Sequence, residues 1–297
     1  MQTTRRFSDW IPILIFLLPG LVLFVLFFLG PMLYSLRISF YDWKIVHPDQ
    51  SIFLGFSNYQ KALSDPIFQR ATLNTAAYTA ITVIVKMILG LAVALLLNQS
   101  LPGRTFFRVA YYLPVITSWV IVSLLFEYMF NGQAGLVNYV LNDIFHFTSK
   151  DVLWFADPIL TLVPIILLDI WKGVGWTAII YLAGLQSIPA ELYEAARVDG
   201  ANPLDQLRYI TWPLLRSSTV FLTVVLVIGG LNAYISFQLM TKGGNPLDLT
   251  HSILTLMYEA TFSRLDFGYG AAISYLLTIF VFFISLIELR LLKQQAM

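Results

Sequence analysis

The sequence predicts an all-α integral membrane protein with six transmembrane helices and a cytoplasmic two-helix loop. Composition is the first indication, because 58% of the 297 residues are hydrophobic and 12% are charged, about half the charged fraction of soluble domains. The second is a set of six apolar segments that reach the length of about 20 residues needed to cross a bilayer. They lie near residues 11–34, 71–97, 109–130, 157–183, 217–239 and 269–289.

The first apolar segment follows Arg5 and Arg6 and extends over about 24 residues without a small-residue cleavage site. A secretory signal peptide has a shorter apolar region that ends at such a site. We therefore expect a retained first span, with residues 1–10 as a cytoplasmic N-terminus and residues 11–297 as the transmembrane domain.

The loop charges indicate the orientation of the chain. Six spans place both termini on one side of the membrane, together with residues 98–108 and 184–216. These segments carry nine Lys and Arg residues, against seven in the longer loops of the opposite side. Because cytoplasmic loops are enriched in Lys and Arg, both termini are expected in the cytoplasm.

Residues 187–216 interrupt the apolar pattern and predict two short helices. Gly200 can take the left-handed conformation that ends a first helix. Asn202 is a suitable N-cap for a second helix, Asp205 occupies the capping-box position, and Pro213 is expected to close that helix. The pattern alone fits two alternatives, a surface that docks a soluble partner or a solvated helix lying at the lipid headgroups.

The same stretch resembles a known motif. Glu194-Ala195-Ala196, Gly200 four residues later, then Ile210 and Pro213 are similar to the EAA loop of binding-protein-dependent ABC importer permeases. The only departure from the motif is Trp212, where the family most often has Leu, so that one apolar residue stands in place of another. Four further segments are similar to those of the sugar importers, and they are closest to the first permease subunit of the maltose/glycerol-3-phosphate type. These segments are YEAARVDGAN, LLPG, GRTFFRVAYYLP and TKGGNP.

This resemblance implies the ABC type I importer permease fold, with residues 187–216 as the coupling loop of a permease domain that covers residues 11–297. The helix carrying Glu194 would insert into a cleft of an ATPase subunit and transmit its closure on ATP binding. The residues implied to couple to the ATPase are Glu194, Ala195, Ala196, Asp199, Gly200, Ile210 and Pro213.

Ionisable residues at membrane depth usually face a bundle interior or a watery cavity. In the fourth predicted span Asp169, Lys172, Gly173 and Trp176 share one helical face by their spacing. A carboxylate, an ammonium group, a gap and an indole suit a polyhydroxyl ligand, but Asp169 and Lys172 could equally neutralise each other, with Trp176 as packing. Lys86 in the second span is expected to snorkel or to pair.

The resemblance favours a binding role for these positions. The four residues of the fourth span match those that line the sugar site of the maltose permease subunit, and this sequence departs from that subunit by carrying charge at two of them. In the fifth span Gly229, Gly230 and Ala233 align with sugar-contacting positions, where small residues indicate either a roomier site or close helix packing. Asn232 and Ser236 are the polar candidates on that helix.

Several chemistries are excluded by the residues themselves. The sequence has no Cys and no G-x-x-x-x-G-K-[ST] motif, so it offers neither thiolate chemistry nor a P-loop for ATP. His47, His146 and His251 lack metal-ligand spacing and are expected to be ordinary residues of outside loops. We expect no enzyme activity, metal or cofactor in this chain, and the resemblance implies that ATP and Mg²⁺ bind to partner ATPase subunits.

The resemblance also implies the partners: a second EAA-type permease in a heterodimer, two ABC ATPase subunits and an extracytoplasmic sugar-binding protein. The chain would lie in the lipid bilayer of the cytoplasmic (inner) membrane and import a sugar or glycoside, and its net charge of +1 gives no sign of nucleic-acid binding. The alternative is an ion-coupled secondary transporter with Asp169 and Glu127 as relay groups. That class is expected to show internal repeats and broken helices, which the sequence does not clearly show.

Overall fold

The computed structural model describes residues 10–99, 102–147 and 150–294, so residues 1–9 of the expected N-terminus lie outside the described residues. Within these ranges five helices are long and apolar enough to cross a membrane, or six if one bent pair counts as a span. The five are Ile15–Ile38, Pro66–Asn98, Pro158–Gln186, Arg216–Thr241 and Phe267–Ile287. Each overlaps a predicted span, which confirms the helical fold class.

The chain forms two compact units. The first unit contains residues 1–63 and 257–276, and the second contains residues 64–256 and 277–297. Helix α15 (Phe267–Gln294) begins in the first and ends in the second.

In the first unit the first span combines two helices and a π-helical turn, followed by a small hairpin. Its elements are α1 (Trp10–Phe24), the π-helical turn Val25–Leu29, α2 (Gly30–Ile38), β1 (Tyr41–Asp42), the 3₁₀ turn Pro48–Gln50, β2 (Ile52–Phe53) and α3 (Ser57–Ser64). The strands pair antiparallel, with Tyr41 opposite Phe53. The Asn58 side chain donates hydrogen bonds to the backbone carbonyls of Ser39 and Tyr41, which fixes the hairpin to α3.

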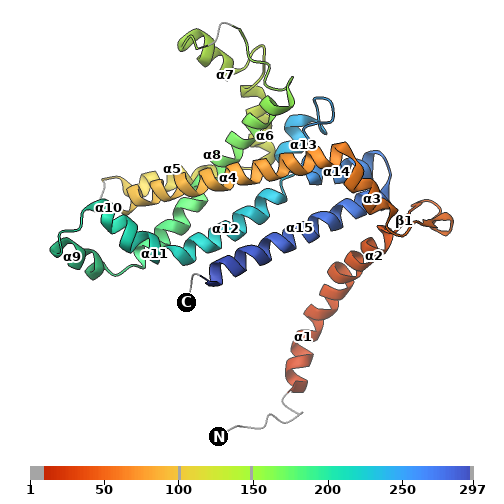
Figure 1. Cartoon of the computed structure of the whole chain (residues 1–297), viewed down its shortest axis with the longest axis horizontal. Helices are drawn as coiled ribbons and strands as arrows, with labels where there is room; N and C mark the ends of the chain where they lie inside the picture. The colour runs from red at the N-terminus through yellow and green to blue at the C-terminus, as the bar shows by residue number, and fades with distance from the viewer. Residues whose placement is uncertain (1–9, 100–101, 148–149, 295–297) are drawn as a thin grey trace. The chain divides into compact units, whose positions relative to one another are not determined.

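The second unit is organised by α4 (Pro66–Asn98), α8 (Pro158–Gln186) and α12 (Arg216–Leu231) (Figure 1). Helices α4 and α8 both begin with Asp followed by Pro. The Asp65 carboxylate accepts a hydrogen bond from the Ile67 amide, and Asp157 caps α8 in the same way. Helix α4 packs most extensively on α8, and their apolar faces join that of α12 in a core that includes Leu182, Leu185 and Leu222.

The third predicted span, residues 109–130, is not one straight helix. It consists of α5 (Arg104–Ile116) and α6 (Trp119–Met129), bent by 93°. The break lies at Thr117 and Ser118, which are extended, with ψ angles of 149° and 131°. Pro114 lacks the amide hydrogen that would support the last turn of α5, and the Thr117 hydroxyl donates to the Pro114 carbonyl over 2.6 Å. Hydropathy detects the apolar length of such a segment but not its bend.

The fifth span is also interrupted. Helix α12 ends at Leu231, and α13 (Ile235–Thr241) begins after a short non-helical segment at residues 232–234. The Asn232 side chain donates to the Ile228 carbonyl over 2.8 Å at this break. The other elements are α7 (Leu136–Tyr139), the π-helical turn Val140–Ile144, α14 (Ile253–Tyr258) and the π-helical turn Glu259–Ser263.

The predicted coupling loop contains α9 (Ala190–Val198), α10 (Pro203–Gln206), a π-helical turn at Leu207–Thr211 and α11 (Trp212–Leu214). Gly200 has a φ of 82°, as expected of a residue that follows a helix end, and Asn202 and Asp205 form the predicted capping box. The helix that begins at Pro203 continues without a break through the π-helical turn and α11 and ends at Leu214, one residue after Pro213, as expected.

Candidate functional site

The second unit contains a partly open cavity of about 590 Å³, a size typical of small-molecule sites. We call it the central cavity. Its walls come from α4, α8 and α12, from the break between α5 and α6, and from the start of α13. All nine residues predicted to bind solute line it: Asp169, Lys172, Gly173, Trp176, Gly229, Gly230, Asn232, Ala233 and Ser236. That solute binds there stays a prediction.

A buried ion pair forms part of the wall. The Lys86 Nζ donates to Asp169 Oδ2 over 2.7 Å, and the two side chains are 6% and 9% exposed. The alternative in which Asp169 and Lys172 neutralise each other is therefore wrong, because Asp169 pairs with Lys86. Lys86 and Tyr78 line the cavity but were absent from the predicted site. The position of Lys86 in the middle of a span was the signal that could have predicted its place in the site, because a lysine at that depth is expected to pair with a buried carboxylate.

Gly173 gives Lys86 its route to Asp169. A Cβ atom on Gly173 would overlap the aliphatic stem of Lys86. The predicted gap on the face of α8 is therefore occupied by the lysine stem, and the ammonium group reaches the carboxylate one helical turn away.

Lys172 supports the break between α5 and α6. Its Nζ donates to the backbone carbonyls of Pro114 (2.9 Å), Val115 (3.1 Å) and Thr117 (2.5 Å), and it lies 5.0 Å from the centre of the Trp119 ring. An ammonium group has three donors, and the last carbonyls of a helix lack partners and carry partial negative charge. Lys172 thus satisfies the end of α5 and ties it to α8.

The two glycines of α12 have different surroundings. A Cβ on Gly230 would lie 2.8 Å from the Thr79 side chain, so Gly230 allows α12 to pack closely on α4. Gly229 faces open space, since no described atom lies within 4 Å of its Cβ position. Of the two explanations for small residues on this helix, close packing holds for Gly230 and extra room holds for Gly229.

Both broken spans face the central cavity. Val115 and Trp119 flank the first break, and Asn232, Ala233 and Tyr234 lie at the second. Non-helical backbone at membrane depth is tolerated where protein buries it or where it lines a cavity. The sequence did not clearly show broken helices, but two of the described spans are broken.

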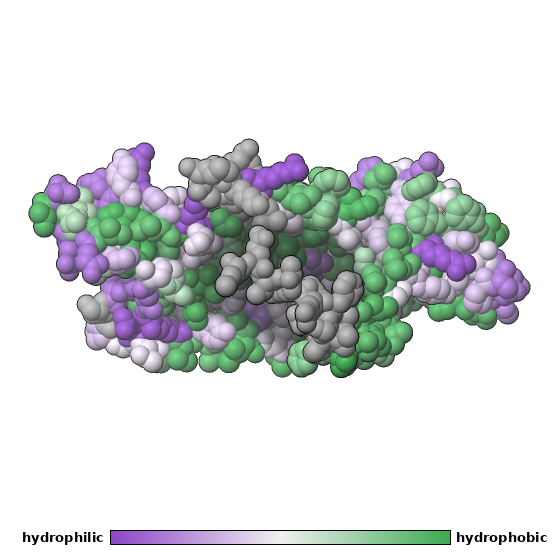
Figure 2. All heavy atoms as spheres, turned by 90° about the horizontal axis from the view of Figure 1, so that it is seen from below, coloured by the Kyte–Doolittle hydropathy of each residue, from purple (hydrophilic) through white to green (hydrophobic). Residues whose placement is uncertain are grey.

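The coupling loop exposes an ordered surface. All nine residues of α9 are exposed or half-buried, and Glu194 is exposed. Val198, Leu204 and Tyr209 are 89%, 72% and 67% exposed. Figure 2 shows hydrophilic and hydrophobic side chains next to each other at the end that α9 and α10 occupy, on the left. Exposed apolar residues rimmed by polar ones are typical of a protein interaction site.

The predicted coupling residues are distributed along this surface. Glu194, Ala195 and Ala196 lie on α9, Asp199 and Gly200 follow its end, Ile210 lies in the π-helical turn and Pro213 in α11. The Tyr193 hydroxyl lies 2.9 Å from the Thr211 hydroxyl, which holds α9 against the π-helical turn. The loop is therefore held in shape by local contacts.

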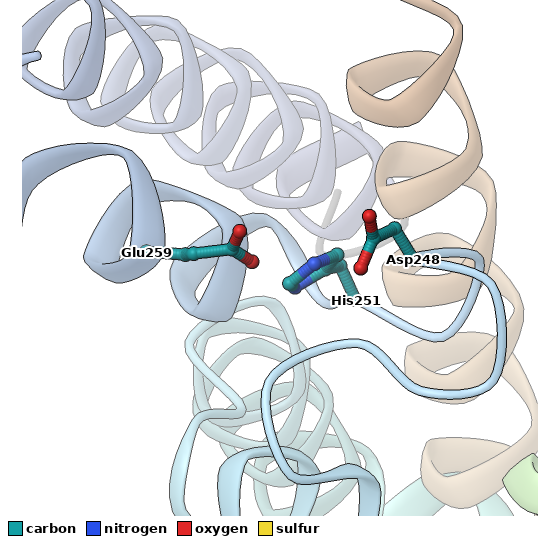
Figure 3. A group of neighbouring side chains, drawn as sticks. All are labelled: Asp248, His251 and Glu259. Atoms are coloured by element: carbon teal, nitrogen blue, oxygen red, sulfur yellow. The ribbon is translucent and has the colours of Figure 1, made fainter. Parts of the chain in front are cut away.

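His251 is not the ordinary loop residue that was expected. It is fully buried, and its Nδ1 lies 3.2 Å from the Thr255 hydroxyl. Asn74 of α4 donates to the His251 backbone carbonyl over 3.1 Å. Of the residues labelled in Figure 3, Asp248 and His251 belong to the second unit and Glu259 belongs to the first.

Comparison with known proteins identifies the family. Residues 86–293 match the family described as "Binding-protein-dependent transport system inner membrane component". The probable ABC transporter permease protein YurN of Bacillus subtilis is 32% identical over 94% of this chain and 95% of its own length. The arabinooligosaccharides transport system permease protein AraP of Bacillus subtilis is 32% identical over 93% of this chain and 87% of its own.

A solved structure has the same fold. A chain of a bacterial ABC transporter involved in the import of the acidic polysaccharide alginate superposes with a TM-score of 0.80 at 23% identity, covering 97% of this chain and 96% of that one. These matches exclude the alternative of an ion-coupled secondary transporter. The chain belongs to the family of binding-protein-dependent transport system inner membrane components, the permease subunits of ABC importers.

Proposed function

We propose that this permease imports a sugar or glycoside, which crosses the membrane through the central cavity. The observation that carries this proposal is the convergence of the nine predicted residues on one cavity, with an indole and several polar groups on its walls. Polar groups can hydrogen-bond sugar hydroxyls, and the Trp176 ring can pack on the apolar face of a sugar. The name of the arabinooligosaccharide relative supports the same solute class.

The proposed assembly has two permeases. A second EAA-type permease completes the translocation pathway, two ATPase subunits bind ATP and Mg²⁺, and an extracytoplasmic binding protein delivers the solute. The termini and α9 lie in the cytoplasm, in agreement with the loop charges. Glu194 and the exposed apolar residues around α9 dock into an ATPase subunit, so that its closure rocks the spans between inward-facing and outward-facing states.

The test is co-purification of this permease with the ATPase and second permease encoded beside it. Wild type is expected to retain the ATPase and to show solute-stimulated ATP hydrolysis, whereas Glu194→Lys loses one or both. Glu191→Lys is the matched control, since it makes the same charge reversal on an exposed residue of α9 outside the motif. Equal losses in the two variants would refute a specific role of Glu194 in coupling.

Transport itself is measured in vesicles. ATP-dependent saccharide uptake by the assembled complex is the expected result. Uptake of other solutes only would contradict the proposed solute class.

A further inference from the structure

We infer that the second unit holds a second saccharide subsite, so that the solute is an oligosaccharide bound along two neighbouring cavities. This inference rests on the proposed function and adds the size of the solute to it. The second cavity has a volume of about 460 Å³. The lining residues that carry the argument are Glu127, Asn131, Gln133, Trp154, Lys242 and Asn245.

The lining groups of the second cavity suit a polyhydroxyl ligand. The Gln133 side-chain amide supplies a donor and an acceptor, and Asn245 supplies its side-chain oxygen. Asn131 supplies its NH2 group, because its side-chain oxygen accepts from two backbone amides of the same loop. Glu127 and Lys242 form an ion pair with a separation of 3.1 Å, and the Lys242 side chain is 73% exposed. The Lys242 ammonium group can therefore exchange water for solute hydroxyls, and the Glu127 side chain, which is 26% exposed, keeps part of its surface open to the cavity.

The aromatic group of this cavity is fixed in place. The Trp154 indole nitrogen donates to the Asn138 side-chain oxygen over 3.0 Å, and its ring packs edge-on against Phe130 at 5.2 Å between centroids. Asn138 is itself buried and donates to the backbone carbonyls of Gly132 and Val152. A ring held in this way loses little conformational entropy on binding, which favours its use as a platform for a sugar ring.

The two cavities share two helices. On α6, Trp119 lines the central cavity and Glu127 the second, and eight residues of helix correspond to a rise of about 12 Å. On α13, Ser236 lines the first and Thr241 the second, a rise of about 7.5 Å. A monosaccharide is shorter than this separation, whereas a linear oligosaccharide can place one ring in each cavity.

The test compares solutes of different length with the complete importer in proteoliposomes. The probes are a panel of neutral saccharides, from monosaccharides to hexasaccharides in several linkages. Trp154→Ala is expected to lower the uptake of trisaccharides and longer chains about tenfold, the effect of one lost aromatic contact, and to change uptake of the shortest imported saccharide less than about twofold. Trp176→Ala in the central cavity is expected to lower uptake at every length.

Two further variants make the result decisive. Gln133→Ala shortens an exposed side chain and should show the same length dependence, so it decides the question if Trp154→Ala fails to fold. Tyr139→Ala is the control, because Tyr139 is an aromatic residue at the end of α7 that is 57% exposed and lies outside the lining of the second cavity. It should leave uptake unchanged at all lengths.

The remaining outcomes overturn the inference in distinguishable ways. Equal losses at all lengths would identify the second cavity as a docking surface for the binding protein. Unchanged uptake of long chains in Trp154→Ala and Gln133→Ala, or a wild type that imports monosaccharides only, would show that no second subsite exists. A wild type that couples ATP hydrolysis to other solutes but imports no saccharide would refute the proposed function itself.

Discussion

Removing one member of the Lys86–Asp169 pair should destabilise the protein far more than removing both. The pair is buried, with side-chain exposures of 6% and 9% and a separation of 2.7 Å. Asp169→Leu leaves an ammonium group at membrane depth without a counter-charge, which costs about 3–5 kcal/mol in comparable buried pairs. Lys86→Met leaves the carboxylate in the same position and should cost a similar amount.

The double variant Lys86→Met/Asp169→Leu should recover most of this loss, because it removes both desolvation costs and keeps the volume nearly constant. The assay is thermal unfolding of detergent-solubilised protein for the wild type, both single variants and the double variant. A loss of 3–5 kcal/mol corresponds to a decrease in Tm of roughly 6–20 °C for a chain of this size. We expect at least half of that decrease to be recovered in the double variant.

The readout of transport separates stability from function. The double variant should remain folded yet import poorly, since both groups line the central cavity. Additive destabilisation, with the double variant as unstable as the sum of the single ones, would refute the coupling of Lys86 to Asp169.

Three other predictions concern the walls of the cavity and the coupling loop. Gly229→Leu should reduce solute uptake with little change in Tm, whereas Gly230→Ala should cost about 1–3 kcal/mol by overlap with Thr79; equal Tm losses would contradict the difference in their surroundings. Lys172→Met should remove the ammonium donor from the Val115 and Thr117 carbonyls and cost about 1–3 kcal/mol, seen as faster proteolysis at the α5–α6 break. Unchanged cleavage there would rule out this supporting role. Asn202→Ala should remove the capping box and cost about 1 kcal/mol, measured as faster amide exchange in α10, and an unchanged exchange rate would argue against the cap.

Local chemistry was predictable from the sequence. Gly200, Asn202 and Asp205 act on residues next to them, so their turn and cap preferences directly predicted the outline of the coupling loop. The cavity-lining face of α8 was predictable for the same reason, since helical spacing alone places Asp169 and Trp176 on one side.

Long-range partners were not predictable in this way. Lys86 and Asp169 are 83 positions apart in the sequence, and Lys172 and Pro114 are 58 apart. Their pairing depends on which helices cross and at which level, and hydropathy contains no information on either. The bend of the third span escaped detection because the apolar neighbours of Thr117 and Ser118 keep the average hydropathy of the segment high, although the backbone of these two residues is extended.

The central cavity has one rigid wall and one adjustable wall. On α8, Asp169 is engaged by Lys86, Gly173 by the stem of the same lysine and Lys172 by the end of α5, so a substitution there disturbs the scaffold. On α12, Gly229 meets open space, and Asn232, which follows the end of this helix, is exposed. A permease built in this way can acquire a new solute through changes on α12 while α8 keeps the transport path intact.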